Sequence, residues 1–252
     1  MTAVVGLVRF EAGPGAMRDN ADGVIQQAGG AAQLGAGIVV FPLNSITGYG
    51  LGPEIGPDQA AAVRHDCQTV ITDLLRQSLR HGLGRCYLLI GTLSWFEAGQ
   101  PQAATVLIHQ GRVVLDYSVG QPDPVRRPWA GPRRAAGQLV ELDRLDQPGM
   151  PDQTRRTDYP GHADQPVVFQ AHGVQFGIRL AATGLWSSWQ AGPDGQAVGS
   201  NPDHQPKIVI LTQGHGKCWA EDPTGQVLSQ GQPSSRGLTL WHASQQSVPP
   251  KN

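Results

Sequence analysis

The spacing of apolar residues divides the first hundred residues into alternating strands and helices. Between residues 16 and 34, apolar side chains recur every three or four positions, which is typical of a helix with one buried face. A second stripe of this kind runs from residue 60 to residue 79, and Pro57 and Asp58 before it are suited to a helix start. Short apolar runs predict buried strands at Val4–Phe10, Ile38–Phe41 and Cys86–Gly91.

From residue 103 onward, short β-type runs dominate the pattern. Ala103–His109 and Arg112–Tyr117 flank Gln110-Gly111, a pair suited to a hairpin turn. Further strands are predicted at Val167–Phe169, Val174–Leu180, Ile208–Leu211, Lys217–Glu221, Val227–Ser229 and Leu238–Trp241. Two helices among strands, followed mostly by strands, favour an α/β fold in which helices cover the outer faces of sheets. We expect one domain over residues 1–245, with a loop-rich insert at about 121–158 and a polar tail at 246–252.

The composition narrows the class of protein without indicating a function. With 252 residues, of which 39% are hydrophobic, the chain can bury one sizeable core. Its formal net charge of -1 provides no attraction to nucleic acid or to an anionic membrane, so we expect neither as a partner. Charged residues make up only 15% of the chain, so uncharged polar residues must cover more of its surface than usual.

The cysteines and the apolar runs indicate a compartment. Cys67, Cys86 and Cys218 are an odd number at wide spacing, which is not the pattern of a disulfide framework or a zinc site. We therefore expect free thiols, no metal and no cofactor. The first ten residues lack the basic start and cleavage site of a signal peptide, and no apolar run approaches the ~18 residues of a membrane span. These features predict a cytoplasmic protein.

The most informative stretch is residues 35–49, Gly-Ala-Gly-Ile-Val-Val-Phe-Pro-Leu-Asn-Ser-Ile-Thr-Gly-Tyr. An apolar strand stops here at Pro42, which has no backbone donor, and a loop follows. Loops at strand ends often present catalytic groups. The stretch resembles the first motif of the nitrilase (carbon–nitrogen hydrolase) superfamily, Phe-Pro-Glu-Leu-x-Leu-Thr-Gly-Tyr. Its Thr-Gly-Tyr ending resembles in particular the glutaminase domain of glutamine-dependent NAD synthetase.

The resemblance continues along the chain in the family's order. Leu89–Thr92 with Ala103–Val114 is similar to a hairpin of the family, and Pro160–Gly177 is similar to the segment before its nucleophile strand. Asp222–Leu228 resembles a late Asp-Pro-x-Gly-x-Val-Leu turn. The resemblance implies a four-layer α-β-β-α sandwich. Because the interval after Trp186 is short of a helix-and-strand region found in the family, we expect a sandwich that is shortened toward the C-terminus.

The sequence lacks the catalytic residues of the family at the positions where the resemblance expects them. Its members cleave C–N bonds with a Glu base, a Cys nucleophile and a Lys that stabilises the oxyanion. The resemblance puts Leu43 at the Glu position, residues Ser118–Gly120 at the Lys position and Ala181 at the Cys position. Leucine has no titratable group, residues 118–120 carry no positive charge and alanine has no nucleophilic atom, so each of the three roles is empty. We therefore predict a catalytically inactive homologue.

A binding role is then the leading hypothesis. The pocket without catalytic groups can hold a small ligand, or the surface can bind another protein. We expect this pocket to be lined by Leu43, Asn44, Tyr49, Ala181 and Trp186. An active homologue, an ammonia-using enzyme or a second copy of the chain are the candidate partners, by analogy with the family. Trp186 either packs over the pocket or forms an exposed contact site.

Cys218 provides the alternative, catalytic hypothesis. It follows a Gly-His-Gly turn, and His215 and Glu221 are close to it in sequence, so a Cys-His pair with a carboxylate is a possible nucleophilic set. The chain would then be a diverged amide hydrolase or glutaminase. The competing interpretation is a packed cysteine on a strand. The loop from Arg126 to Arg134 carries four arginines, which are either solvated charges or an anion site.

Overall fold

The computed structural model describes residues 2–48, 57–95, 101–118, 139–141, 167–181, 208–213, 217–221, 227–230 and 237–244. The first part contains β1 (Thr2–Val8), α1 (Met17–Gln33), β2 (Ile38–Val40), α2 (Pro57–Arg80), the short 3-10 helix η1 (Leu83–Arg85) and β3 (Tyr87–Trp95). The remainder contains β4 (Pro101–His109), β5 (Arg112–Ser118), β6 (Leu139–Glu141), β7 (Val167–Ala171), β8 (Val174–Ala181), β9 (Ile208–Gln213), β10 (Lys217–Glu221), β11 (Val227–Gln230) and β12 (Leu238–Ser244).

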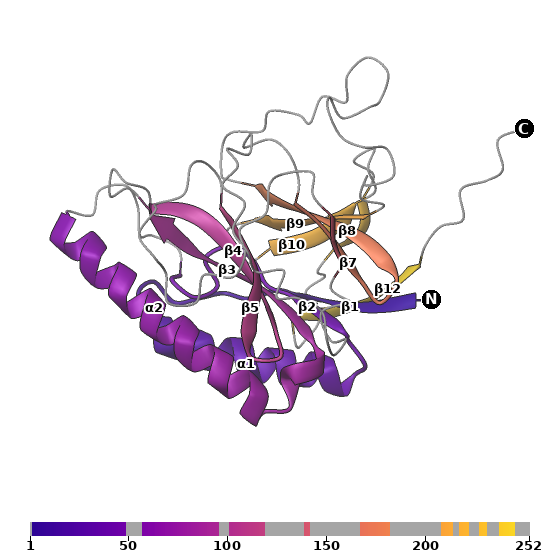
Figure 1. Ribbon diagram of the computed structural model, residues 1–252, viewed down its shortest axis with the longest axis horizontal. Helices are drawn as coiled ribbons and strands as arrows, with labels where there is room; N and C mark the ends of the chain where they lie inside the picture. Colours follow the sequence, from indigo (N-terminus) through magenta and orange to yellow (C-terminus); the bar gives the residue numbers. More distant parts are fainter. Residues whose placement is uncertain are drawn as a thin grey trace, which may run out of the picture.

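The described strands form two six-stranded mixed sheets. The first sheet has the order β12-β1-β2-β3-β4-β5, and the second has the order β11-β10-β9-β8-β7-β6. In the first sheet β1, β2 and β3 are parallel, and α1 and α2 connect them. Both helices lie together on one side of this sheet, and the second sheet lies on its other side (Figure 1). The α/β class predicted from the sequence is therefore confirmed.

Two apolar clusters hold these layers together. The cluster between the helices and the first sheet includes Ile25, Ala28, Ile71 and Leu74 from the helices and Val39, Leu88 and Ile90 from the strands. The cluster between the sheets includes Val5, Val40, Leu89 and Leu107 from the first sheet and Val174, Phe176, Cys218 and Ala220 from the second. Successive residues of β3 thus face opposite sides of the sheet, which is why its first half, Tyr87–Ile90, is an unbroken apolar run. Among the described residues the arrangement has three layers, α-β-β.

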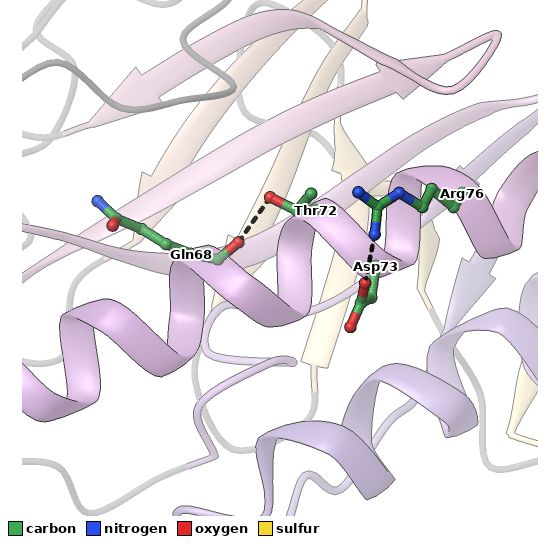
Figure 2. A network of polar contacts seen from close by, with 4 residues as sticks. All are labelled: Gln68, Thr72, Asp73 and Arg76. Carbon is green, nitrogen blue, oxygen red and sulfur yellow. Dashed lines mark hydrogen bonds and ion pairs between the residues drawn. The ribbon is translucent and has the colours of Figure 1, made fainter.

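The outward surface of α2 is polar. The hydroxyl of Thr72 donates to the carbonyl of Gln68 at 2.9 Å, and Arg76 forms an ion pair with Asp73 at 3.0 Å (Figure 2). The side chains of this ion pair are 66% and 53% exposed, so water screens the interaction and it adds little stability. The amphipathic pattern of the sequence, and not these surface contacts, accounts for the position of the helix.

Most elements lie where the sequence predicts them, and one strand, β6, and the short helix η1 were missed. The expected hairpin turn is confirmed: Gln110 and Gly111 have φ of 49° and 67°, as a type I′ turn requires. The predicted loop over residues 121–158 is wrong at Leu139–Glu141, because these residues form β6 and pair with β7 in parallel. Leu139 and Val140 are only two successive apolar residues, too few to form an apolar run like Ile38–Phe41 or an alternating pattern.

At the end of the sandwich where β2 and β3 begin, aromatic rings connect the sheets. Tyr87 stacks on His109 at 4.1 Å between ring centroids, and it forms a T-shaped pair with His172 at 5.6 Å. His172 and Gly173 form the turn between β7 and β8, with φ of 52° and 73°. The imidazole of His172, in a turn of the second sheet, therefore packs against Tyr87 of the first sheet.

Candidate functional site

The positions that the resemblance assigns to catalysis lie at the ends of three strands. In the first sheet, Leu43 follows β2, and Ser118 is the last residue of β5. The register runs from Gly91 on β3 to Thr105 on β4 and on to Tyr117 on β5. Because the backbone of residues 42–44 lies against Gly91, Ser118 is at the same end of the sheet as Leu43. Three strand spacings of about 4.8 Å separate β5 from β2.

The second sheet brings its own strand end to this end of the sandwich. Cys218 on β10 pairs with Thr212 on β9, which pairs with Leu180 on β8. The thiol of Cys218 lies 3.6 Å from the carbonyl oxygen of Val40, the last residue of β2. Leu180 is therefore in register with the residue that contacts the end of β2, and Ala181 after it is the last residue of β8. The structure thus gathers the three positions at one end of the two sheets.

The loop after β2 is held against β3 by hydrogen bonds. The backbone N–H of Phe41 donates to the Leu89 carbonyl at 2.8 Å, which continues the strand pairing by one residue. The N–H of Ile46 and the hydroxyl of Ser45 both donate to the Gly91 carbonyl, at 3.2 and 3.1 Å. Gly91 has no side chain, and this lets the loop cross directly over β3. We refer to residues 41–48 as the site loop.

Within the site loop, the position assigned to the base is closed to solvent. The Leu43 side chain is 5% exposed and belongs to the apolar cluster between the sheets. Its neighbour Asn44 has a φ of 59°, a left-handed conformation that Asn tolerates better than most residues. The Asn44 carbonyl accepts from the Gly48 N–H at 2.7 Å, whereas its buried side-chain Oδ1 has no hydrogen-bond partner in the described part of the chain. A charged carboxylate at residue 43 would be costly to bury.

Cys218 lies inside the core and not on an accessible surface. The residue is 2% exposed, and its thiol donates to the carbonyl of Val8 at 3.2 Å. Burial raises the pKa of this thiol from 9.0 to about 12, so almost none of it is thiolate near neutral pH. Since the thiolate is the reactive form, these observations do not favour Cys218 as a nucleophile. Burial also raises the pKa of Cys67 to about 12.

Several predicted site residues lie outside the described part of the chain. These are Tyr49, Trp186, His215, residues 119–120 and the loop from Arg126 to Arg134. Of the Cys218 set, Glu221 is the last residue of β10. The sequence interpretation overlooked Gly91 as the residue on which the site loop rests. An isolated glycine inside a strand pattern was the available signal, because it often marks a close approach of another backbone.

Two hollows lie along the helices, away from the inter-sheet core. One, of about 370 Å³, is lined by residues 15–19 of the α1 start and by Asp66, Thr69 and Val70 of α2. The other, of about 530 Å³, lies between the later turns of both helices and includes Gly29, Gly30 and His81. Among the described residues, no group of three or more His, Cys, Asp or Glu side chains is arranged to hold a metal ion. No helix in the described ranges is both long and apolar enough to cross a membrane.

No protein-family model matches the sequence, and no curated protein sequence matches it. Solved structures do match. A cysteine-to-alanine mutant of the Nesterenkonia AN1 amidase, from the nitrilase superfamily, superposes with a TM-score of 0.55 at 14% identity. The match covers 96% of this chain and 90% of the amidase chain. The chain therefore has a carbon–nitrogen hydrolase-like fold, as the sequence resemblance implied.

Two glutamine-dependent NAD+ synthetases match as well. The enzyme from Acinetobacter baumannii, in complex with adenosine diphosphate, has a TM-score of 0.57 at 16% identity, over 100% of this chain and 49% of that one. The enzyme from Cytophaga hutchinsonii has a TM-score of 0.52 at 14% identity, over 96% of this chain and 43% of that one. The chain spans about half the length of these synthetases. At such identities the likeness is one of fold.

Proposed function

We propose that this chain is a catalytically inactive homologue of the carbon–nitrogen hydrolases, with a ligand-binding, scaffolding or regulatory role. The observation that carries the proposal is that residue 43 is apolar and buried. Leu43 stands where the family has its general base, and it is an apolar side chain packed between the two sheets at 5% exposure. No proton can be taken up by this group, and the site loop keeps it away from solvent.

The other two positions support the same proposal. Ser118 ends β5 and Ala181 ends β8, so neither strand end carries a lysine or a cysteine. Catalysis of this type depends on all three groups acting together, and loss of one member of such a unit typically costs several orders of magnitude in rate. The only cysteine near these strand ends in the described part of the chain, Cys218, is buried with a raised pKa.

A binding role is supported by what remains around the vacant positions. The strands, the turns and the hydrogen-bonded site loop are retained, although the chemistry they would serve is absent. Asn44 supplies a polar side chain beside Leu43 in this loop. A partner protein is the second form of the proposal: an active homologue, an ammonia-using enzyme or a second copy of this chain, by analogy with the fold.

An ammonia-release assay tests the proposal. Purified protein is incubated with glutamine and with a panel of small amides and nitriles, and an active glutaminase of the same fold serves as the positive control. We expect no release above that of the Cys218→Ala variant, run in parallel. Release by the unmodified chain that disappears in Cys218→Ala would overturn the proposal and establish Cys218 as the nucleophile. Release that persists in the variant would show a catalytic group elsewhere.

A further inference from the structure

One side chain connects the site loop to the start of the first helix. Asn20, in the first turn of α1, is 5% exposed. Its Oδ1 accepts from the backbone N–H of Gly13 at 2.8 Å, and its Nδ2 donates to the Gly13 carbonyl at 2.8 Å and to the Ile46 carbonyl at 2.9 Å. Three short hydrogen bonds from one amide thus end on two separate segments of backbone.

The two segments also contact each other directly. The N–H of Gly15 donates to the Thr47 carbonyl at 2.9 Å. Gly48, with a φ of 74°, lies so close to the Gly13 carbonyl that any side chain on it would collide with that group. The segment after β1 and the site loop after β2 therefore meet along several residues, and Asn20 is the side chain that contacts both.

Only an amide matches this set of partners. Asn offers one acceptor and two donors, and here it faces one N–H and two carbonyl groups. Asp has nearly the same shape but no donor when ionised, so its second oxygen would face the carbonyls of Gly13 and Ile46. A helix-favouring Ala would fit α1 but leave these backbone groups without Asn20 as their partner.

We propose that Asn20 is a positioning residue of the candidate site, which fixes the conformation of residues 46–48 and, through them, the placement of Leu43 and Asn44. This inference rests on the proposed function in one respect: the site loop is taken to belong to the ligand-binding end. Asn20 holds the loop from the α1 side through the Ile46 carbonyl, whereas the contacts to Gly91 on the β3 side use the Ser45 hydroxyl and the Ile46 N–H.

Amide hydrogen exchange, followed by NMR without any ligand, tests the proposal. In Asn20→Asp we expect the amide protons of Gly15 and Gly48 to exchange at least ten times faster than in the unmodified chain. The amide of Phe41, bonded to Leu89 on the β3 side, should change far less. Asp19→Asn is the matched control, because it exchanges the same two residue types at the exposed neighbouring position of α1.

The outcomes are distinct. Acceleration that is equal at Gly15, Gly48 and Phe41 would mean a general loss of stability and would overturn a positioning role, as would no acceleration at all. If Asn20→Asp does not fold, Asn20→Ser is measured in the same way, because its smaller hydroxyl leaves room and keeps one donor. The ammonia-release assay is independent of this experiment, so a catalytically active chain would disprove the proposed function without touching the inference about Asn20.

Discussion

Gly91 lies so close to Pro42 that a Cβ atom added to the glycine would overlap the Pro42 carbonyl oxygen and the Cα of Leu43. The same atom would lie 2.8 Å from the backbone nitrogen of Asn44. These neighbours are backbone atoms, which cannot move aside as the end of a flexible side chain can. The position of the site loop is therefore tied to the absence of a side chain on β3.

This contact predicts that Gly91→Ala destabilises the fold. The added methyl group must push the site loop away from β3 and weaken the two hydrogen bonds to the Gly91 carbonyl. We expect the free energy of unfolding to fall by about 2–3 kcal/mol. Urea denaturation followed by circular dichroism measures the change. An unchanged midpoint would mean that the loop does not rest on Gly91.

Gly29→Ala is the matched control for that substitution. Gly29 lies inside α1, and a Cβ atom there meets nothing within 4 Å. Because alanine restricts the unfolded chain and favours a helix, we expect this variant to be more stable by roughly 0.5–1 kcal/mol. The same chemical change should thus have opposite signs at the two glycines.

Restoring a carboxylate at residue 43 should harm the fold without restoring catalysis. In Leu43→Glu the side chain must be buried between the sheets, so we expect a loss of about 3 kcal/mol at neutral pH. Burial raises the pKa of this acid in the folded state, so the loss should shrink as the pH falls from neutral toward the unfolded-state pKa of about 4.3, and should change no further below it. Leu43→Met, of similar volume, should cost less than about 1.5 kcal/mol. Ammonia release from Leu43→Glu, absent from the unmodified chain, would contradict the expectation that a carboxylate at this position alone does not restore catalysis.

The buried thiols predict a loss of stability at alkaline pH. Cys218 has a folded-state pKa of about 12 against 9.0 as its ordinary value. Above pH 9 the unfolded chain releases this proton and the folded chain keeps it, so stability falls as the pH rises. Between pH 8 and pH 10, Cys218 alone should account for about 1.4 kcal/mol. In Cys218→Ala, urea denaturation at these two pH values should show a loss that is smaller by this amount; equal losses would argue against the burial of the thiol.

The contact between Gly37 and His172 predicts a coupled pair. A Cβ atom on Gly37 would lie 2.5 Å from Nε2 of His172. Gly37→Ala should therefore destabilise the chain, and much less so when His172→Asn has already shortened the neighbouring side chain while keeping a residue that tolerates positive φ. A double-mutant cycle should give an interaction energy of about 1 kcal/mol or more. Additive effects would show that the imidazole does not occupy this space.

The sequence predicted the elements far better than their contacts. The 3–4 residue spacing of α1 and the apolar runs of β2 and β3 are local signals, and these elements appear within a few residues of their expected bounds. Cys218 illustrates the limit: its strand was predicted correctly, but nothing local indicates that its thiol contacts Val8 and Val40 in the other sheet. The packing of the site loop against Gly91 likewise involves residues that are distant along the chain. Leu43 was assigned by resemblance alone, and the structure adds that it is buried.

The pairing of β1 with β12 has a consequence for how this domain is made. Residues Thr2–Val8 of β1 pair antiparallel with Leu238–Ser244 of β12. In the sheet, β1 lies between β12 and β2, so one of its two neighbours is not synthesised until almost all of the described chain exists. During translation, β1 therefore remains an open edge, able to pair with other strands while β2 to β11 emerge from the ribosome. Completion of the first sheet is a late, long-range event. A chain whose synthesis ends before residue 238 would lack β12, and this edge would stay exposed to chaperones and to aggregation.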